Sequence, residues 1–492
     1  MLLCAAITGC AVAPRQEIAA DLNEECREVF LRVDRAVAGA GVQDGMAARV
    51  QEFPYLRVDR FLASYAGENL NDAQFADWMN RMVELGSQAR SFEIANLPAR
   101  EAEALGHALW DIGRARAWAA PALADCTARL AAADSSDPAR RAALRDAASV
   151  PDDYATGNRV AGLYWLTRIP FASGVRKWQA EVREAFAAPL ATLPASGELK
   201  TYAPPPGRLT ATEVATLLGR TSTNALGIPD PRGADLDSMF RTFAPVFTVE
   251  TAEDADLPGE LGWREGDVPR IVSRLPVVYR RASHARYQGR PLLQLNYWLW
   301  FPERPKGAGW DILGGHLDGV LWRVTLAPDG TPWVFDAIHP CGCYHLFFPT
   351  ARAAARPQPE SLDETVFIPQ SLPRLAGDAR VELRIDSGTH YLRRILVRDG
   401  AAQSAAEYVF AEDDSLRSLP LPESGRRSIF RPDGIVPGSE RGERWLFWPM
   451  GVPEPGAMRQ WGRHATAFVG RRHFDDPGLL ERYFVLKGVN GE

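Results

Sequence analysis

Apolar residues in the first part of the chain recur at the spacing of amphipathic helices. One run follows the i, i+3, i+4, i+7 pattern of a helix with a single buried face: Phe75, Trp78, Met79, Met82 and Val83. Alanine, leucine and glutamate, which all favour helices, dominate residues 101–118. Pro54, Pro98 and Pro121 separate the runs. We predict a helical domain over residues 11–186, built as a bundle.

A proline-rich segment follows at residues 187–210. It contains Pro189, Pro194, Pro204, Pro205 and Pro206. Proline fixes its own φ and removes a backbone donor, so a cluster of prolines disfavours regular elements. We expect a linker between two domains here.

Beyond the linker the pattern changes to short runs rich in β-branched and aromatic residues, which is typical of strands. These runs are residues 246–249, 277–279, 293–301, 321–326, 381–385 and 392–397. Turn dipeptides such as Gln288-Gly289 and Asp329-Gly330 separate them. Strands without intervening helices favour an antiparallel sandwich or barrel. The predicted fold class is therefore α+β, with an antiparallel β-sandwich-like domain over residues 211–492.

The N-terminus changes the picture of where the protein works. Apolar residues lead into Ile7, Thr8, Gly9 and Cys10, and these four resemble a bacterial lipobox. The resemblance implies that residues 1–10 are a lipoprotein signal peptide and that Cys10 carries fatty acyl groups such as palmitate. Because Ala11 follows Cys10, it also implies the periplasmic face of the outer membrane. The segment lacks the basic n-region of a signal peptide, and its apolar run is short. A start codon assigned downstream of the true one would explain both features. The alternative interpretation is a cytosolic protein with an apolar N-terminus.

The composition of the chain disfavours some classes of binding partner. The 492 residues are 46% apolar and 24% charged, as in an ordinary globular protein, and the net charge is −6. Without a basic block, nucleic acid is a poor partner. No run of about 18 apolar residues occurs, so we predict membrane attachment through the lipid anchor alone.

Four cysteines follow Cys10, and an even number in an oxidising compartment predicts disulfides. Cys26 and Cys126 lie in helical patterns and could join two helices; two buried thiols are the alternative. Cys341 and Cys343 could close a tight, turn-locking disulfide.

Three of the eight histidines lie within residues 315–345, in a pattern that predicts a β-hairpin. Residues i and i+2 of a strand face the same side, so His316 and Asp318 should project together. His339 or His345 would arrive from the returning strand. Two histidines and one carboxylate suit iron(II), manganese or zinc. A structural polar cluster is the alternative interpretation, and His284 or His390 could also turn towards this site.

The second half resembles the necrosis-inducing-protein type of β-sandwich in three stretches. These are residues 243–246, the aromatic run 297–302, and Gly315-His316 with Asp318 before Trp322. That family binds a divalent cation through a histidine- and aspartate-rich motif and acts on membrane lipids. The resemblance implies a sandwich and carries over His316 and Asp318 as ligands. The motif's second histidine and its glutamate are missing here.

Two functions follow as hypotheses. The first is a membrane-anchored envelope lipoprotein that binds a lipid or glycan, favoured by a dense set of aromatic residues: Trp298, Trp300, Trp310, Trp322 and Trp333. The apolar stretch 162–171, followed by Arg176 and Lys177, is either a core segment or one that contacts a membrane or an acyl chain. The second is a metal-dependent enzyme that uses the His/Asp/His site. Serine-hydrolase, P-loop and dinucleotide-binding motifs are not found.

Overall fold

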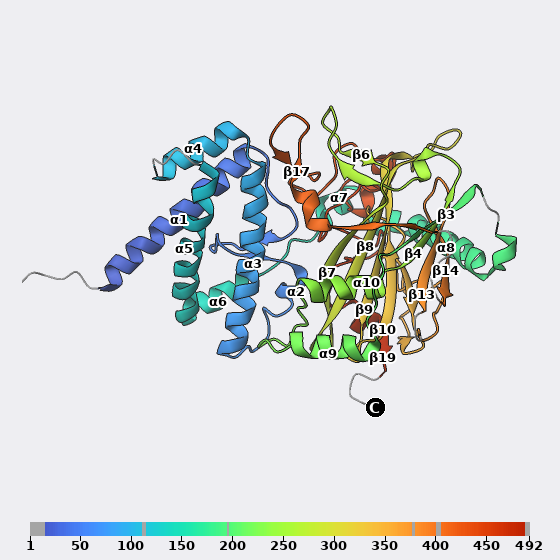
Figure 1. Ribbon diagram of the computed structural model, residues 1–492, viewed down its shortest axis with the longest axis horizontal. Helices are drawn as coiled ribbons and strands as arrows, with labels where there is room; N and C mark the ends of the chain where they lie inside the picture. The colour runs from blue at the N-terminus through green and yellow to red at the C-terminus, as the bar shows by residue number, and fades with distance from the viewer. Residues whose placement is uncertain (1–14, 111–114, 194–195, 376–378, 400–404, 488–492) are drawn as a thin grey trace, which may run out of the picture.

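A computed structural model describes residues 15–110, 115–193, 196–375, 379–399 and 405–487. The predicted signal peptide and Cys10 lie outside these residues. The described chain contains both helices and strands, so the α+β class is confirmed. A helical part and a β-rich part lie side by side along the longest axis (Figure 1).

Helices form most of the chain up to residue 147. They are α1 (Arg15–Gly39), α2 (Arg60–Ala63), α3 (Asp72–Asn96), α4 (Ala99–Trp110), α5 (Ala115–Ser136) and α6 (Pro138–Ala147), with short strands β1 (Ala48–Arg49) and β2 (Arg57–Val58). The apolar run read from the sequence lies on α3, where Phe75, Trp78 and Met82 are buried. These residues share one hydrophobic core with Phe30 of α1 and Leu130 of α5.

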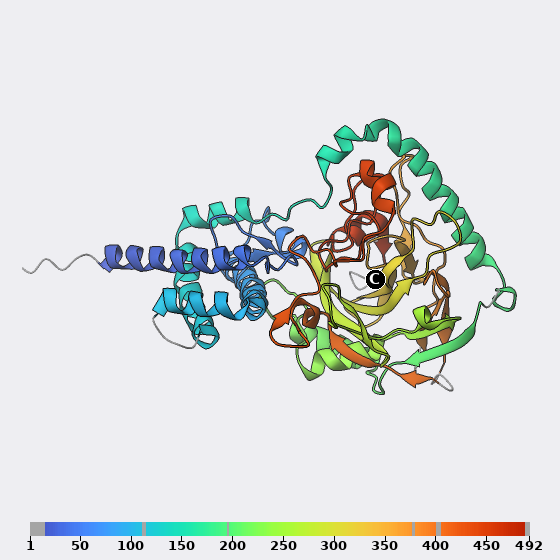
Figure 2. The same cartoon turned by 90° about the horizontal axis from the view of Figure 1, so that it is seen from above.

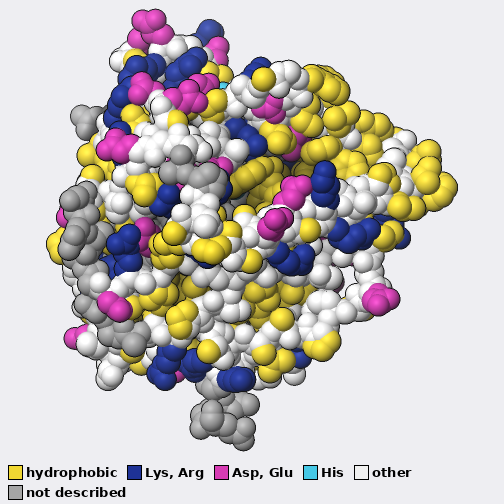
Figure 3. All heavy atoms as spheres, turned by 90° about the vertical axis from the view of Figure 1, so that its right-hand side faces the viewer, with side chains coloured by type: hydrophobic (Ala, Val, Ile, Leu, Met, Phe, Trp, Pro, Cys, Tyr) yellow, Lys and Arg dark blue, Asp and Glu magenta, His cyan; other side chains and the backbone are white. Residues whose placement is uncertain are grey.

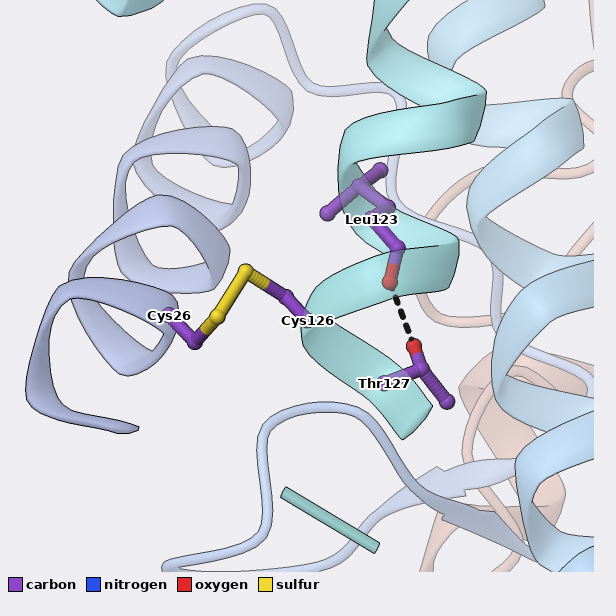
Figure 4. Close-up of a disulfide and its surroundings, with 4 residues drawn as sticks. All are labelled: Cys26, Leu123, Cys126 and Thr127. Atoms are coloured by element: carbon purple, nitrogen blue, oxygen red, sulfur yellow. Dashed lines mark hydrogen bonds between the residues drawn. A yellow bond between two sulfur atoms is a disulfide. The ribbon is translucent and has the colours of Figure 1, made fainter. Parts of the chain in front are cut away.

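A disulfide joins the first and fifth helices, as predicted. Cys26 on α1 and Cys126 on α5 are bonded, with their Cα atoms 5.1 Å apart and a separation of 100 positions in the sequence (Figure 4). Both cysteines belong to the helical core. The bridge fixes α1 against α5 independently of the apolar packing between them.

The β-rich part contains a six-stranded sheet in the order β11-β10-β9-β8-β7-β16. Its strands are β7 (Val277–Tyr287), β8 (Arg290–Arg304), β9 (Gly315–Leu326), β10 (Pro332–Ile338), β11 (Leu346–Pro349) and β16 (Val409–Glu412). The predicted hairpin is confirmed, because β9 and β10 pair antiparallel with Asp336 opposite Arg323. Gln288 and Gly289 both have positive φ, as a tight two-residue hairpin loop requires.

A five-stranded sheet has the order β14-β13-β4-β3-β15. Its strands are β3 (Glu198–Ala203), β4 (Val246–Thr251), β13 (Arg380–Ile385), β14 (Leu392–Arg398) and β15 (Ala406–Glu407). Leu383 and Phe247 of this sheet share a core with Leu295 and Trp322 of the six-stranded sheet. The sheets are not purely antiparallel as expected, since β13–β4, β15–β3 and β16–β7 are parallel pairs.

The remaining elements are short or cover the sheets. They are α7 (Thr156–Ala161), α8 (Tyr164–Ala187), α9 (Ala211–Thr221), α10 (Ala234–Phe243), α11 (Glu443–Phe447), α12 (Leu479–Tyr483), β5 (Glu260–Gly262), β6 (Arg270–Ser273), β12 (Ala353–Ala355), β17 (Leu419–Pro420), β18 (Arg426–Arg427), β19 (Phe484–Leu486), and the 3₁₀ turns η1 (Leu190–Thr192), η2 (Asp254–Asp256), η3 (Asp413–Arg417) and η4 (Trp448–Met450). Within the described residues, no helix has the length and apolarity that crossing a bilayer requires.

The structure divides the chain differently from the sequence-based boundaries. α7 and α8 fall inside residues 11–186, yet α8 packs Phe186 into the core of the β-rich part. Figure 2 shows α8 arching around that part, away from the other N-terminal helices. The expected linker, residues 187–210, contains β3, which pairs with β4 in the sheet. Helical spacing predicts a buried face but not the body against which that face packs.

Candidate functional site

An apolar cavity of about 510 Å³ lies between α8 and residues 443–472, which we call the C-terminal segment. Its wall includes the aromatic and aliphatic side chains Phe171, Val175, Trp178, Phe367, Phe447 and Phe468. In Figure 3, a hollow with a largely hydrophobic wall is visible on this side of the molecule. Concave sites of roughly 300–1,000 Å³ with apolar walls and a few polar groups are the usual form of small-ligand sites.

Helix α8 forms one wall of the cavity and is bent at a proline. Pro170 lies inside the helix and offers no backbone N–H to the carbonyl of Leu166. Proline in a helix interior produces a kink, and Figure 2 shows α8 curving around the β-rich part. Trp178, further along α8, reaches the opposite side, with its ring 5.3 Å from that of Tyr344 and 5.5 Å from that of Phe367.

Two tyrosines supply polar atoms to the cavity lining. The rings of Tyr344 and Tyr391 lie 4.6 Å apart, and Arg304 donates a hydrogen bond of 3.2 Å to the Tyr391 hydroxyl. Burial raises the pKa of Tyr391 and raises that of Tyr344 well above its ordinary value. Both hydroxyls are therefore neutral at physiological pH and can exchange hydrogen bonds with a ligand.

Glu443 is a buried carboxyl group in the same lining. Burial raises its pKa to about 7, and Arg441 and Arg304 oppose this increase only in part. Near neutral pH the group therefore spends much of its time protonated. A neutral carboxyl can donate as well as accept a hydrogen bond.

His345 also lines the cavity and is hydrogen-bonded to Asp336 of β10. Its Nε2 lies 2.9 Å from Asp336, whose carboxylate also accepts two hydrogen bonds from Arg323. Burial lowers the pKa of His345 to about 3, so the ring is neutral. A carboxylate only accepts, so Nε2 carries the proton and Nδ1 is an acceptor. Among the described residues, that Nδ1 has no hydrogen-bond partner.

A second group of buried charges lies around Asp318. One of its oxygens is 3.2 Å from Nδ1 of His339, and the other is 3.0 Å from Nδ1 of His390. Nε2 of His390 lies 3.4 Å from Asp256, and Arg441 approaches Asp318 at 3.5 Å. Histidine and carboxylate thus alternate in a continuous buried row.

Asp318 and His390 each favour the charged form of the other. Burial opposes ionisation of Asp318, but Arg441 and the histidine contacts hold its pKa well below the ordinary value. Burial acts against the charge of His390 as well, yet its two carboxylates raise its pKa. His339 shows the reverse balance, because burial outweighs Asp318 and lowers its pKa. His339 touches the cavity lining through Tyr344, with the rings 5.1 Å apart.

Backbone strain is concentrated at the same place. Leu317, Tyr344 and His390 have φ values of 55°, 61° and 53°, in the left-handed region that disfavours residues with a Cβ. Each such residue costs on the order of 1–3 kcal/mol and persists only where the surroundings enforce it. One precedes Asp318, one precedes His345, and the third is itself a member of the row. The surrounding packing therefore enforces the geometry of both polar groups.

The structure does not assemble the metal site expected from the sequence. His316 turns away and its Nε2 lies 2.6 Å from the carbonyl oxygen of Pro269, while His345 binds Asp336. Only Asp318 and His339 of the four candidates meet. The argument from alternation fails because Leu317, between His316 and Asp318, is left-handed. Among the described residues, no group of three or more His, Cys, Asp or Glu side chains is arranged to hold a metal ion.

The second predicted disulfide is not formed. Cys341 and Cys343 are free thiols on the apolar cavity. Gly342 bends the chain between them with φ 90°, and a turn closes with the His339 N–H donating to the Cys343 carbonyl at 3.0 Å. The histidines of this segment consequently diverge instead of following one strand face.

Some of the lining residues carry no signal in the sequence. Tyr391, Glu443 and Phe468 come from distant segments without a motif, and only the fold brings them together. His390 belongs to the row around Asp318 and not to the lining, and its place in a strand-like run made it a candidate to turn towards that site. The tryptophans expected at a ligand surface are mostly core residues: Trp298, Trp300, Trp322 and Trp333 are buried and Trp310 is exposed.

Comparison with known proteins adds no relative. No family model matches the chain, and neither a curated protein nor a solved structure matches it. The likeness to necrosis-inducing proteins therefore stands on the sequence stretches alone. Of the two ligands it carries over, His316 and Asp318, each contacts different partners.

Proposed function

We propose that this protein is an envelope lipoprotein that binds the acyl chain of a lipid in the apolar cavity. The observation that carries the proposal is the cavity itself, about 510 Å³ with Phe171, Val175 and Trp178 in its wall. Moving an acyl chain from water to such a wall is favourable by about 0.8 kcal/mol for each buried CH₂ group. A glycan would need many hydrogen-bond partners, whereas this lining offers few.

The polar groups of the lining suit one polar end on the ligand. The Tyr344 and Tyr391 hydroxyls and the partly protonated Glu443 can all exchange hydrogen bonds near neutral pH. Glu364 and Arg472 also line the cavity, but both already hold hydrogen bonds within the protein. We therefore favour a long acyl chain ending in a hydroxyl, ester or carboxyl group. The metal-dependent alternative loses its support, because His316 and His345 bind other partners.

The proposed location is the periplasmic face of a bacterial outer membrane, with attachment through acylated Cys10. Residues 7–10 support it by their resemblance to a lipobox. The Cys26–Cys126 disulfide supports it independently, since structural disulfides accumulate in oxidising compartments. Labelling of cells with a fatty-acid analogue should mark the wild type and leave Cys10→Ser unmarked. Equal labelling of both would contradict the anchor.

We also infer the finer architecture that was expected, a helical bundle followed by a β-sandwich-like body. The hydrophobic core common to α1, α3 and α5 favours the bundle. The core common to both large sheets favours the sandwich-like packing, although three strand pairs are parallel.

The test of the ligand is to fill the cavity. Val175 lines it from α8, and Val175→Trp adds an indole to the space the chain would occupy. Ala180→Trp is the matched control, because Ala180 lies on the exposed side of the same helix. Titration with a fluorescent fatty acid should show affinity reduced at least tenfold, about 1.4 kcal/mol, in Val175→Trp only. Equal affinity in both variants, or no binding by the wild type, would refute acyl binding at this site.

A further inference from the structure

A group of large apolar side chains is exposed at the edge of the apolar cavity. We call it the rim patch: Val160, Leu163, Trp165, Leu166 and Ile169 from α7 and the start of α8, with Trp445, Leu446 and Trp448 from α11 and η4. Trp165 is 69% exposed and Trp445 is 71% exposed. In Figure 3, hydrophobic side chains gather on one side of the hollow, forming a projecting surface. Contiguous exposed apolar surface of this kind marks an interaction site.

The two segments of the rim patch lie against each other and lead into the cavity. Phe171 and Phe447 meet edge to face at 5.0 Å, and a side chain added at Gly162 would meet Pro449 at 2.5 Å. Phe171 follows Ile169 by two positions, and Phe447 stands between Leu446 and Trp448. Phe171 and Phe447 both line the cavity. The apolar wall therefore continues from the interior to the surface.

The stretch of chain that carries α7 and the first part of α8 is basic. Residues 156–177 contain Arg159, Arg168, Arg176 and Lys177 and no acidic residue, in a chain whose net charge is −6. Arg159 is buried, and Arg168 faces Asp363 at 3.6 Å. Arg176 and Lys177 are exposed, with Glu181 4.0 Å from Lys177. The surface beside the exposed apolar residues thus offers cations to a partner that carries negative charge.

We propose that the rim patch docks onto the surface of an anionic lipid bilayer and opens the apolar cavity towards the acyl layer. This rests on the proposed acyl binding, which it deepens by naming the source of the ligand. Exposed tryptophan beside leucine and isoleucine is the side-chain combination that enters the interface between headgroups and chains. Arg176 and Lys177 would then face lipid phosphates, and the chain could move between bilayer and cavity without crossing water.

Vesicle sedimentation with full-length, unlipidated Cys10→Ser protein tests the docking. The rim variant Trp165→Gln/Leu166→Gln/Ile169→Gln changes only exposed side chains. Its matched control, Leu31→Gln/Leu199→Gln/Leu275→Gln, replaces three exposed leucines outside the rim patch. On vesicles of phosphatidylcholine with phosphatidylglycerol, we expect the rim variant to lose at least tenfold in binding and the control to match its parent.

A charge variant separates electrostatic attraction to anionic lipid from non-specific hydrophobic adsorption. Arg176→Gln/Lys177→Gln should bind anionic vesicles several-fold less for each cation removed, and added salt should weaken the parent in the same way. Vesicles of phosphatidylcholine alone should bind the parent and the charge variant equally. Equal binding of the parent and the rim variant to anionic vesicles would overturn the proposal.

Two further results keep docking and acyl binding apart. The rim variant should bind free fluorescent fatty acid as its parent does, while Val175→Trp should lose the fatty acid and keep its vesicle binding. A parent that sediments as a dimer without vesicles, and as a monomer in the rim variant, would assign the rim patch to a second copy of the chain and overturn the membrane partner.

Discussion

Two cavities of equal volume, about 510 Å³ each, differ completely in what lines them. The apolar cavity is walled mainly by aromatic and aliphatic side chains. The second, which we call the charged cavity, lies between α2, α3 and β7. Its lining is dominated by ionisable side chains: Asp59, Arg60, Arg81, Glu84, Arg281 and Asp475. Volume alone therefore says nothing about what a cavity holds.

Two arginines of the charged cavity are already paired with carboxylates of the protein. Arg60 contacts Asp153 at 2.7 Å and Asp475 at 3.1 Å. Arg281 contacts Asp413 at 2.9 Å and also pairs with Asp414. A polar ligand would have to compete with these internal partners. The ion pairs around the charged cavity thus hold the helical and β-rich parts together. The lining of the apolar cavity remains available for a ligand.

The largest test of this contrast removes the disulfide on the helical side. Cys26→Ser/Cys126→Ser opens a loop whose ends are 100 positions apart, and the free energy of unfolding should fall by about 4–5 kcal/mol. Fatty-acid affinity at temperatures where the protein stays folded should be unchanged. Urea unfolding and ligand titration measure the two effects. The control Cys341→Ser/Cys343→Ser breaks no bond, so an equal loss of stability in both variants would contradict this view.

Next in size is the removal of one charge from the charged cavity. Arg281→Met removes the ion-pair partner of Asp413, while Asp414 keeps Arg417. Losing one partner of a buried ion pair lowers the free energy of unfolding by about 3–5 kcal/mol. Acyl binding should again be unaffected. Arg232→Ala provides the control in the same cavity, because its ion pairs are exposed and worth less than about 1 kcal/mol. A stable Arg281→Met with weakened acyl binding would reverse the roles assigned to the two cavities.

The smallest expected effect is on the pH dependence set by the apolar cavity. With a folded pKa of about 7, above its unfolded value, Glu443 holds a proton in the native state that the unfolded chain has lost. Its contribution to stability therefore falls as pH rises from about 4.5 to 7. Glu443→Gln should remove this slope and stabilise the protein at pH 8 by about 1–3 kcal/mol in urea unfolding. Exposed Glu423→Gln should keep the slope; if both variants keep it, Glu443 is not the titrating group.

The sequence predicted elements better than it predicted the site. The runs 293–301 and 321–326 are parts of β8 and β9, and the hairpin that brings Asp318 near His339 forms as expected. These features depend on local periodicity and on a turn, which neighbouring residues determine. The prediction fails at Leu317. Its left-handed backbone turns His316 away from Asp318, and the hydrophobic pattern contains no sign of this conformation.

The cavity could not have been predicted from the chain by itself. Its wall takes Phe171 from a helix, Phe367 from a loop, and Phe447 and Phe468 from the C-terminal segment. In the sequence, none of these phenylalanines differs from one that fills an ordinary core. That they leave a space instead of filling it depends on the bend at Pro170 and on the depth at which α8 packs, which are properties of the assembled structure.

The bond between Cys26 and Cys126 also bears on how the molecule is made. The chain is synthesised from its N-terminus, so Cys126 follows Cys26 after 100 positions. Cys341 and Cys343 are synthesised much later. Among the cysteines after Cys10, the native pair is the first that can form. An oxidant acting during synthesis would then close the helical part correctly, whereas oxidation of the completed, denatured chain offers competing pairs with Cys341 and Cys343.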